Sequence, residues 1–252
     1  MLGLGGSLST SGGVQGLIPT DISGLELWLK FNTGVAGASH TTAAANMDDD
    51  EVIHSWADQA ENFNAVQTTD SQRPNWEDAT TDISFNGDND HMDLEGGDIS
   101  ISANQDFTIA VRFKFTDFAA SYALVGHSAQ NVLKVNSNTS ISTLIGGTGG
   151  SVFEEDSDTL AADVYYIFTL VRSGGSDGDL KIYVDGGAYS DKSWDDVAEH
   201  TDPDAFTIGT IGSASDNSLN PLGFMRDVII YKGTALTAGQ RADLYSYING
   251  QT

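Results

Sequence analysis

Hydrophobic and polar residues alternate along several segments of this chain of 252 residues. In residues 107–115 (FTIAVRFKF), Phe, Ile or Val occupies every second position. Residues 25–31 (LELWLKF) show the same period of two, which is the period of a strand with one face in the core. Both segments therefore predict β-strands that are buried on one face.

Further short apolar segments continue this pattern, and clusters of Gly, Asn, Asp and Ser separate them. These segments are 122–126, 131–135, 141–145, 164–172, 180–184, 206–211 and 224–231. Short strands joined by polar turns at regular intervals are typical of a β-sandwich or barrel. The turn residues that follow 165–172 and 180–185 indicate consecutive hairpins, as in a meander or a jelly roll.

A short helix is predicted near the C-terminal end. Thr237 and Gln240 have the spacing of a capping box, in which the two side chains satisfy the first backbone donors of a helix. We expect Leu244, Tyr247 and Ile248 to face the sandwich, and the helix to end at the glycine that follows.

One folded domain is expected, because sandwiches of this length commonly form one domain and no linker-like stretch divides the chain. We predict an arm in residues 1–20 and the sandwich in residues 21–252. The arm is rich in Gly and Ser and carries leucines, a composition that fits a frayed terminus and a docking segment equally well. In the docking interpretation, Leu2, Leu4 and Leu8 contact the partner.

The charge of the chain restricts its partners. With 11 Lys and Arg against 36 Asp and Glu, the formal net charge is −25, which repels nucleic acid and anionic membranes. We interpret this acidity as a source of solubility ahead of cation binding. The absence of Cys excludes disulfides, thiolate metal sites and a cysteine nucleophile. The first basic residue is Lys30, so the positively charged start of a secretory signal is not expected.

The order of these features resembles the concanavalin A-like, laminin G-like superfamily over residues 22–249. The segments that carry the resemblance are SGLELWLKF, ISFNGDNDHMDL, FTIAVRFKF, YYIFTLVRSGGSDGDLKIYVDGG, FTIGTIGS and LGFMRDVIIYKGTALTAGQRADLYSYI. In the last segment, Asp227, Tyr231 and Leu236 stand where the family often has an acidic residue, a tyrosine and a leucine. Arg226 departs from the small residue that is commoner at its position. The resemblance implies an all-β, two-sheet antiparallel jelly-roll sandwich with a short C-terminal helix, a fold that hosts many functions.

Catalysis is not expected from this sequence. Glucanases of the family place two glutamates and an aspartate on one strand, where they act as nucleophile and general acid. The corresponding Glu-x-Asp-x-x-Glu spacing does not occur, and the nearest acidic cluster, residues 154–158, lacks the last carboxylate. The five histidines lie singly, without metal-ligand spacing, and are expected in loops or at the surface. We therefore assign no catalytic residue and rank a glycoside hydrolase third among the candidate functions.

Calcium is the one candidate cofactor, because it binds carboxylate and carbonyl oxygens in turns. Asp88, Asp90 and Asp93 follow the turn at Asn86 and Gly87 and form the candidate metal site. They do not fit the EF-hand pattern, which requires a glycine after the third ligand and a glutamate at the twelfth position. Ordinary turn chemistry is the favoured interpretation of these aspartates.

A saccharide site would need an exposed aromatic ring beside polar side chains. Trp194 with Asp195 is the best local match, and Trp28, Trp56 and Trp76 are alternatives. Core packing is the commoner role of such tryptophans.

The opening segment MLGLGGSLSTSGG also resembles the openings of short virion proteins of marine tailed phages, in which an arm precedes a globular module. We therefore expect a non-catalytic structural protein of the virion, a capsid decoration or tail-associated protein whose arm docks on a capsid or tail protein. Deletion of residues 2–18 should then abolish attachment and leave the fold intact. The alternative is a lectin-like carbohydrate-binding module in extracellular or cell-surface adhesion, calcium dependent if the aspartates bind the ion.

Overall fold

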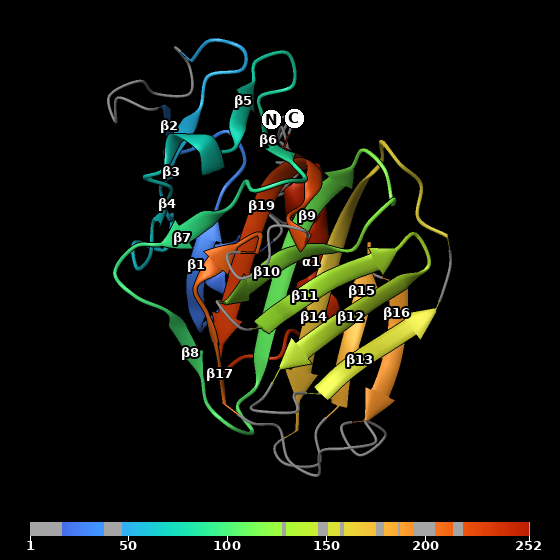
Figure 1. Cartoon of the computed structure of the whole chain (residues 1–252). Helices are drawn as coiled ribbons and strands as arrows, with labels where there is room; N and C mark the ends of the chain where they lie inside the picture. The colour runs from blue at the N-terminus through green and yellow to red at the C-terminus, as the bar shows by residue number, and fades with distance from the viewer. Residues whose placement is uncertain are drawn as a thin grey trace, which may run out of the picture.

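The computed structural model describes residues 17–37, 47–127, 130–145, 151–156, 159–174, 179–185, 187–193, 205–213 and 219–251. Within these ranges, two large antiparallel sheets face each other and one α-helix lies on the outer face of one sheet (Figure 1). The predicted fold class, an all-β sandwich with a short C-terminal helix, is confirmed. None of the described helices is long and apolar enough to cross a membrane.

The sheet that carries the helix, here called the helix-side sheet, has eight strands. Seven follow the order β16-β15-β14-β9-β19-β6-β5, and β1 also pairs with β19. Their bounds are β16 (Gly187–Ser193), β15 (Asp179–Val184), β14 (Tyr165–Ser173), β9 (Phe107–Phe115), β19 (Leu222–Lys232), β6 (Asp82–Asn86), β5 (Asn75–Glu77) and β1 (Leu25–Leu29).

The opposite sheet has nine strands in the order β13-β12-β11-β10-β18-β7-β4-β3-β2. Their bounds are β13 (Ser151–Asp156), β12 (Ser140–Ile145), β11 (Gln130–Ser137), β10 (Tyr122–His127), β18 (Thr210–Ile211), β7 (Met92–Leu94), β4 (Ala65–Val66), β3 (Ile53–Trp56) and β2 (Val35–Gly37). The remaining elements are the pair β17 (Phe206–Ile208) and β8 (Ile99–Ile101), the 3-10 helices η1 (Pro19–Asp21) and η3 (Asp70–Gln72), and α1 (Ala238–Asn249).

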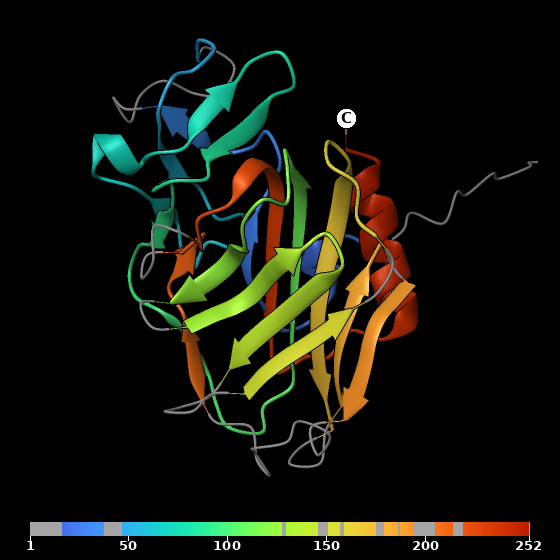
Figure 2. The same cartoon turned by 45° about the vertical axis from the view of Figure 1, so that its right-hand side comes forward.

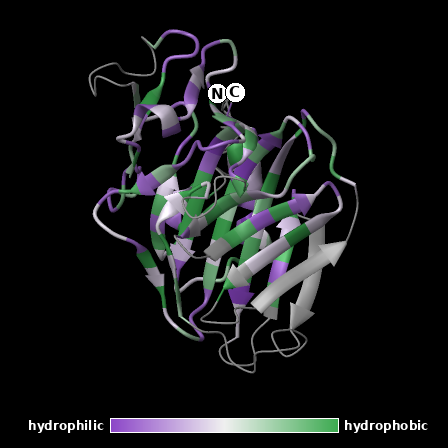
Figure 3. Ribbon diagram, in the orientation of Figure 1, coloured by the Kyte–Doolittle hydropathy of each residue, from purple (hydrophilic) through white to green (hydrophobic). Residues whose placement is uncertain are grey.

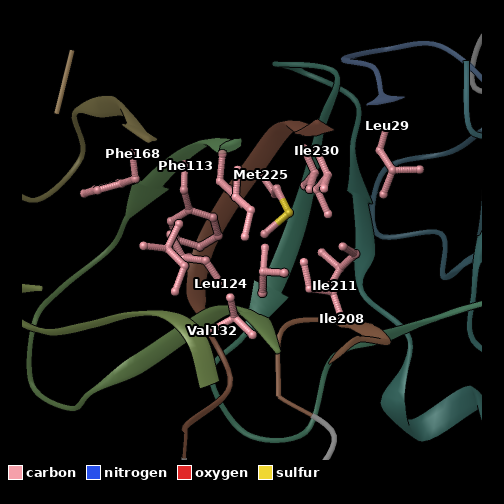
Figure 4. Packing of buried hydrophobic residues seen from close by; sticks show 14 of the residues in the cluster. Leu29, Phe113, Leu124, Val132, Phe168, Ile208, Ile211, Met225 and Ile230 are labelled. Atoms are coloured by element: carbon pink, nitrogen blue, oxygen red, sulfur yellow. The ribbon is translucent and has the colours of Figure 1, made fainter. Parts of the chain in front are cut away.

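One hydrophobic cluster fills the space between the two sheets. Phe113 of β9 and Met225 of β19 point toward Leu124 and Val132 of the opposite sheet (Figure 4). Figure 3 shows the hydrophobic positions concentrated along the strands and many hydrophilic positions in the loops around β2 to β7. Because each large apolar side chain stabilises the fold by about 1.5–3 kcal/mol when fully buried, this cluster holds the two sheets together.

A second cluster lies between the helix-side sheet and α1 (Figure 2). Leu244, Tyr245 and Ile248 of α1 cover Ile167 of β14 and Ile229 of β19. The helix therefore closes the outer face over the central strands. The prediction that β9 is buried on one face was wrong for this reason, since all but one of its residues are buried.

The predicted capping box of α1 is confirmed. The backbone N–H of Gln240 donates to Thr237 Oγ1 over 3.3 Å, and the backbone N–H of Thr237 donates to Gln240 Oε1 over 3.0 Å. The helix ends at Asn249, and Gly250, the glycine that was predicted to stop it, is the capping residue. Tyr247, which was expected to face inward, is only partly buried, because Tyr245 takes the inward position.

The chain joins the sandwich at η1. The Tyr231 hydroxyl donates to the carbonyl oxygen of Pro19 over 3.2 Å, and the Ile18 N–H donates to Asp21 Oδ2 over 3.0 Å. These contacts begin inside the predicted arm of residues 1–20. A deletion that spares them therefore has to end before Ile18, and one that ends at residue 16 removes none of the described residues.

Candidate functional site

Two groups of predicted site residues lie outside the described residues. Leu2, Leu4 and Leu8 were assigned to partner docking, and Trp194 and Asp195 to ligand binding. Their assignment stays a prediction.

The three alternative tryptophans are core residues. Trp28, Trp56 and Trp76 are buried, and the Trp56 indole N–H donates to the carbonyl oxygen of Lys30 over 3.0 Å. None of the three can serve as an exposed aromatic platform. The alternative interpretation, that such tryptophans pack in the core, is confirmed for these three.

The aspartates of the candidate calcium site lie in and after the tight turn between β6 and β7. Asn86 Oδ1 accepts the backbone N–H groups of Asp88, Asn89 and Asp90 over 2.8 to 3.4 Å. Asp90 is buried and accepts the Asn86 N–H over 2.9 Å, whereas Asp88 and Asp93 are exposed. Burial raises the pKa of Asp90 to about 7.

The described part of the chain holds no group of three or more His, Cys, Asp or Glu side chains arranged to hold a metal ion. The contacts of Asn86 and Asp90 are the ordinary chemistry of an Asx turn. Calcium binding at Asp88, Asp90 and Asp93 stays a prediction.

Two of the histidines were expected at the surface or in loops and are buried instead. His54 and His91 border a polar network centred on Arg73 and Gln67. Arg73 Nε donates to the backbone carbonyl of Gln67 over 2.7 Å, and Gln67 Nε2 lies 3.1 Å from His91 Nε2. The network joins β3, β4 and the segment before β7, and we interpret it as structural.

The Asp58 carboxylate accepts hydrogen bonds from a loop of the chain and has a structural role. Its two carboxylate oxygens accept four backbone N–H groups over 2.7 to 3.0 Å, from Trp28, Ala60, Asn62 and Phe63. The same loop borders an acidic hollow of about 320 Å³ that also includes Glu61 and Glu95. The Asp58 carboxylate is already engaged, so the exposed polar groups that this hollow offers are two glutamates and two asparagines.

A buried ion pair lies on the outer face of the helix-side sheet. Arg226 Nε lies 2.5 Å from Asp82 Oδ1, and the Tyr165 hydroxyl donates to Asp82 Oδ2. The Arg226 guanidinium also lies 4.2 Å from the centre of the Tyr165 ring. Burial, together with the hydrogen bond to Asp82, raises the pKa of Tyr165. Arg226, the departure from the family pattern, is thus part of a closed structural cluster.

A β-bulge brings Asp227 to the same region. The pairing of β19 with β9 shifts between Met225 and Asp227, which leaves Arg226 as the extra residue. Asp227 Oδ1 accepts the Phe31 N–H over 3.2 Å, and burial raises the pKa of Asp227 to about 6. We interpret Asp227 as the residue that ties the chain after β1 to the last strand.

A second hollow, here called the α1 hollow, opens beside the start of α1 and has a volume of about 270 Å³. Alternate residues of β14 and β15 form its floor, because Val171 pairs with Lys181 in the sheet and side chains two residues apart share a face. The segment before α1 and the first turn of the helix form its wall. The lining residues are Val171, Ser173, Lys181, Tyr183, Ala235, Leu236, Thr237 and Arg241.

Arg241 is held in a defined position in this hollow. Its guanidinium lies 3.8 Å from the centre of the Tyr183 ring, and one terminal nitrogen donates to the Leu236 carbonyl oxygen over 2.6 Å. Its Nε is buried and has no hydrogen-bond partner among the described residues. The described lining residues carry two cationic groups, a phenol and two hydroxyls. In the strand pairing, Asp191 stands opposite Lys181 and Asp179 stands opposite Ser173.

Sequence reasoning missed the α1 hollow. The alternation of 180–184 places Lys181 and Tyr183 on one face, and Arg241 follows the capping residue Thr237 by one helical turn. These two local signals are visible in the sequence. The sequence does not show the packing of α1 against β14 and β15, and this packing brings Lys181, Tyr183 and Arg241 together.

The chain was compared with known families and structures. The family model described as the concanavalin A-like lectin/glucanases superfamily, a laminin G type model, matches residues 86–240. No curated protein matches the chain.

Solved structures share the fold at low sequence identity. A Trypanosoma rangeli sialidase in complex with sialic acid is 16% identical over 94% of this chain and 36% of its own, with a TM-score of 0.58. The binding domain of botulinum neurotoxin serotype D is 16% identical over 89% of this chain and 51% of its own, with a TM-score of 0.57. The same neurotoxin's ligand-binding domain in complex with N-acetylneuraminic acid has a TM-score of 0.55 at 16% identity, over 90% of this chain and 51% of its own. The chain thus spans only about a third to a half of these proteins.

Proposed function

The chain belongs to the concanavalin A-like lectin/glucanases superfamily, and on that basis we propose that it is a non-catalytic module that binds saccharides. The observation that carries the proposal is the α1 hollow. Ser173 and Tyr183 contribute hydroxyls to its lining, and hydroxyls can both donate to and accept from the hydroxyls of a sugar. Two of the structural neighbours are complexes with sialic acid or N-acetylneuraminic acid, which supports a saccharide as the ligand class.

The size of the hollow suits a small part of a glycan. Its volume of about 270 Å³ lies near the lower end of the range of small-molecule sites, which is roughly 300–1,000 Å³. One or two sugar residues could enter it. The floor of the hollow is a regular part of the sheet, so ligand binding there requires little reorganisation.

The buried carboxylates support the absence of catalysis in this proposal. Asp58 accepts four backbone N–H groups, Asp82 is bound by Arg226 and Tyr165, and Asp227 accepts the N–H of Phe31. A glycosidase needs two carboxyl groups that flank the scissile bond. These three carboxylates serve structural contacts instead.

A glycan array probed with the full-length protein tests the proposal, followed by titration of the best ligand. We expect Tyr183→Ala to weaken binding by about tenfold, because the substitution removes both the phenol and the ring that supports Arg241. Tyr247→Ala is the matched control, since Tyr247 is a partly buried tyrosine at the other edge of α1, against Trp28. An array without any bound saccharide would contradict the proposal.

The same titration distinguishes the two candidate sites. If Trp194→Ala weakens binding and Tyr183→Ala does not, the ligand binds at the site predicted from sequence and the assignment to the α1 hollow is wrong. Incubation of the bound glycan with the protein should leave it intact. Release of reducing sugar would overturn the non-catalytic part of the proposal.

We further propose that the module is displayed on a virion through its N-terminal arm. The composition of the arm and its resemblance to phage virion proteins support this, and the Tyr231 contact to Pro19 fixes the chain directly after residues 1–16. Co-sedimentation with capsids of the source virus tests it. The full-length protein should sediment and the variant lacking residues 2–16 should not, while both unfold at the same temperature. Equal sedimentation of the two proteins would refute the docking role of Leu2, Leu4 and Leu8.

A further inference from the structure

The outer face of the helix-side sheet continues beyond the C-terminal end of α1. Arg112 of β9 lies at this end, because its Nη1 donates to the carbonyl oxygen of Ile248 over 2.7 Å. Lys114, two residues further along β9, points to the same side of the sheet, since side chains two residues apart share a face. Lys114 is partly exposed. The part of the face that lies beyond the helix is therefore accessible to solvent.

Strand register aligns five side chains on this part of the face. From β14 to β5, the residues that pair in register are Tyr165, Lys114, Phe224, Ser84 and Asn75. All five are partly exposed, and we call them the transverse row. Because neighbouring strands lie about 4.8 Å apart, the row is about 19 Å long. A ligand that follows the row lies across the strands and must itself be extended.

Phe224 is the aromatic residue of the row that can pack against such a ligand. It belongs to neither of the two hydrophobic clusters of the described residues. Lys114 Nζ lies 4.2 Å from the centre of its ring, a cation–π contact that covers one side of the ring and holds it in place. Its neighbour on the other side of the row is Ser84, whose side chain is too short to cover a phenyl ring. One face of the Phe224 ring is therefore available.

Tyr165, at the other end of the row, has a supporting role. Its ring centre lies 4.2 Å from the Arg226 guanidinium and 5.0 Å from Lys114 Nζ. Its hydroxyl donates to Asp82, so the ring is fixed within the buried ion-pair cluster. The Lys114 ammonium thus lies between two rings, and contacts with ring faces use none of its hydrogen-bond donors.

Neutral polar groups adjoin the open face of Phe224. Ser84 supplies a hydroxyl from β6, and Asn75 supplies a carboxamide from β5. Both groups can donate and accept hydrogen bonds. A ring face beside such groups suits a sugar, because the C–H groups of the sugar pack on the aromatic ring while its hydroxyls bond to the polar side chains.

We propose that the transverse row binds a neutral oligosaccharide that lies across the strands, as a second contact surface in addition to the α1 hollow. This inference rests on the proposed saccharide-binding function and adds an extended, neutral chain as ligand class. Phe224 packs against a sugar ring, Lys114 and Asn75 bond to hydroxyls, and Ser84 leaves the space that the sugar occupies. The net charge of −25 does not oppose the approach of an uncharged ligand.

The test compares sugar chains with their single units. We would titrate the full-length protein with glucose, cellohexaose and maltohexaose, and with N-acetylglucosamine and chitohexaose, by NMR and calorimetry. At least one hexasaccharide should bind about a hundredfold more tightly than its own monosaccharide, because only a chain contacts several residues of the row at once. Its affinity should change little when salt is added, since the ligand carries no charge.

Variants locate the chain on the sheet. Phe224→Ala should lower the affinity for the hexasaccharide to near that of the monosaccharide. Ser84→Arg should do the same, because a second cation then covers the open face of the Phe224 ring. The matched controls are Phe63→Ala, in the loop between β3 and β4, and Ser100→Arg, at an exposed position of β8, and both should keep the tight binding. Equal losses in the variants and their controls would refute the assignment to the row.

The outcomes separate this inference from the proposed function. Equal affinity for monosaccharides and hexasaccharides would overturn the role of the row and leave saccharide binding intact. Lack of binding to all five ligands, together with an empty glycan array, would overturn both. Tight binding of a chain that survives Phe224→Ala and Ser84→Arg would place the chain elsewhere and contradict the proposal.

Analytical ultracentrifugation tests the other possible occupant of the row, a second copy of this chain. We expect the full-length protein and Ser84→Arg to sediment alike in the absence of ligand. A dimer that Ser84→Arg dissociates would show that a second copy covers the row, and the proposal would be wrong.

Discussion

An arginine lies over a tyrosine ring at two places on the outer face of the helix-side sheet. Arg226 lies 4.2 Å from the Tyr165 ring centre, and Arg241 lies 3.8 Å from that of Tyr183. At the first place, Asp82 is fully buried and neutralises the arginine. At the second, the guanidinium donates to the Leu236 carbonyl oxygen and borders the α1 hollow. The same pair of side chains thus belongs to a buried ion pair at the first place and to the wall of an open hollow at the second.

Removal of the buried carboxylate should have the largest effect. Asp82→Asn leaves Arg226 without its charged partner in a buried setting, so we expect a loss of about 3 kcal/mol in the free energy of unfolding. Urea denaturation measures this loss. Asp70→Asn is the matched control, because Asp70 pairs with Arg73 but its side chain is 84% exposed. Equal losses in the two variants would show that burial does not distinguish the two ion pairs.

Two buried carboxyls with a raised pKa, those of Asp90 and Asp227, predict the next effect. Burial raises the pKa of Asp90 to about 7 and that of Asp227 to about 6, both above the ordinary value of 3.8. Because the folded state binds these protons more tightly than the unfolded state does, this stabilisation is complete below about pH 4 and is lost as the pH rises through 6 and 7. The free energy of unfolding should be larger at about pH 5 than at about pH 8, by on the order of 2 kcal/mol.

Asp90→Asn separates the contributions of the two groups. The amide oxygen can still accept the Asn86 N–H, but the residue no longer titrates. The pH dependence of stability should become flatter in this variant, chiefly near pH 7. A protein whose stability rises from pH 5 to pH 8 would contradict the prediction.

A carboxylate introduced into the lining of the α1 hollow should make the second place resemble the first. Ser173→Asp replaces a hydroxyl of the hollow by a charged group, and it should lower the affinity for the saccharide ligand by about tenfold. Ser100→Asp, at an exposed position of β8, adds the same charge elsewhere and should have little effect. Titration of the unchanged protein and of the two variants with the best ligand of the glycan array measures the difference.

The smallest effect is expected for stability when Arg241 is changed. The Arg241→Gln variant loses one hydrogen bond to a carbonyl and one contact with Tyr183 at a partly exposed position, so we expect a change of about 0.5–1 kcal/mol in the free energy of unfolding. Thermal and urea unfolding measure it. A loss as large as that of Asp82→Asn would show that both arginines are structural and would remove the contrast between the two places.

The local patterns of the sequence predicted the elements and not the sites. The alternation in residues 107–115 and the capping box at Thr237 depend on neighbours in the chain, and both predictions are confirmed as elements. The burial of β9 on both faces depends on α1, which is more than 120 residues away. The alternation of polar and apolar residues in a strand does not show whether a distant helix covers its polar face.

The clusters were beyond sequence reasoning because their members are distant in the chain. Asp82 and Arg226 are 144 residues apart, and Tyr165 is 83 residues from Asp82. The shift in pairing between Met225 and Asp227 leaves no signature in the sequence beyond the unusual Arg226. The α1 hollow likewise needs the packing of α1 on β14 and β15 before Lys181 and Arg241 can share a site.

The position of β19 has a consequence for how the protein is made. This last strand pairs with β9, β6 and β1, so it joins parts of the helix-side sheet that have no other described pairing with one another. A ribosome releases β19 only after all the other described strands have been synthesised. Long-range pairings of this kind form slowly, and unpaired strand edges are prone to aggregate while they wait. The net charge of −25 opposes this aggregation, because the unfinished chains repel one another.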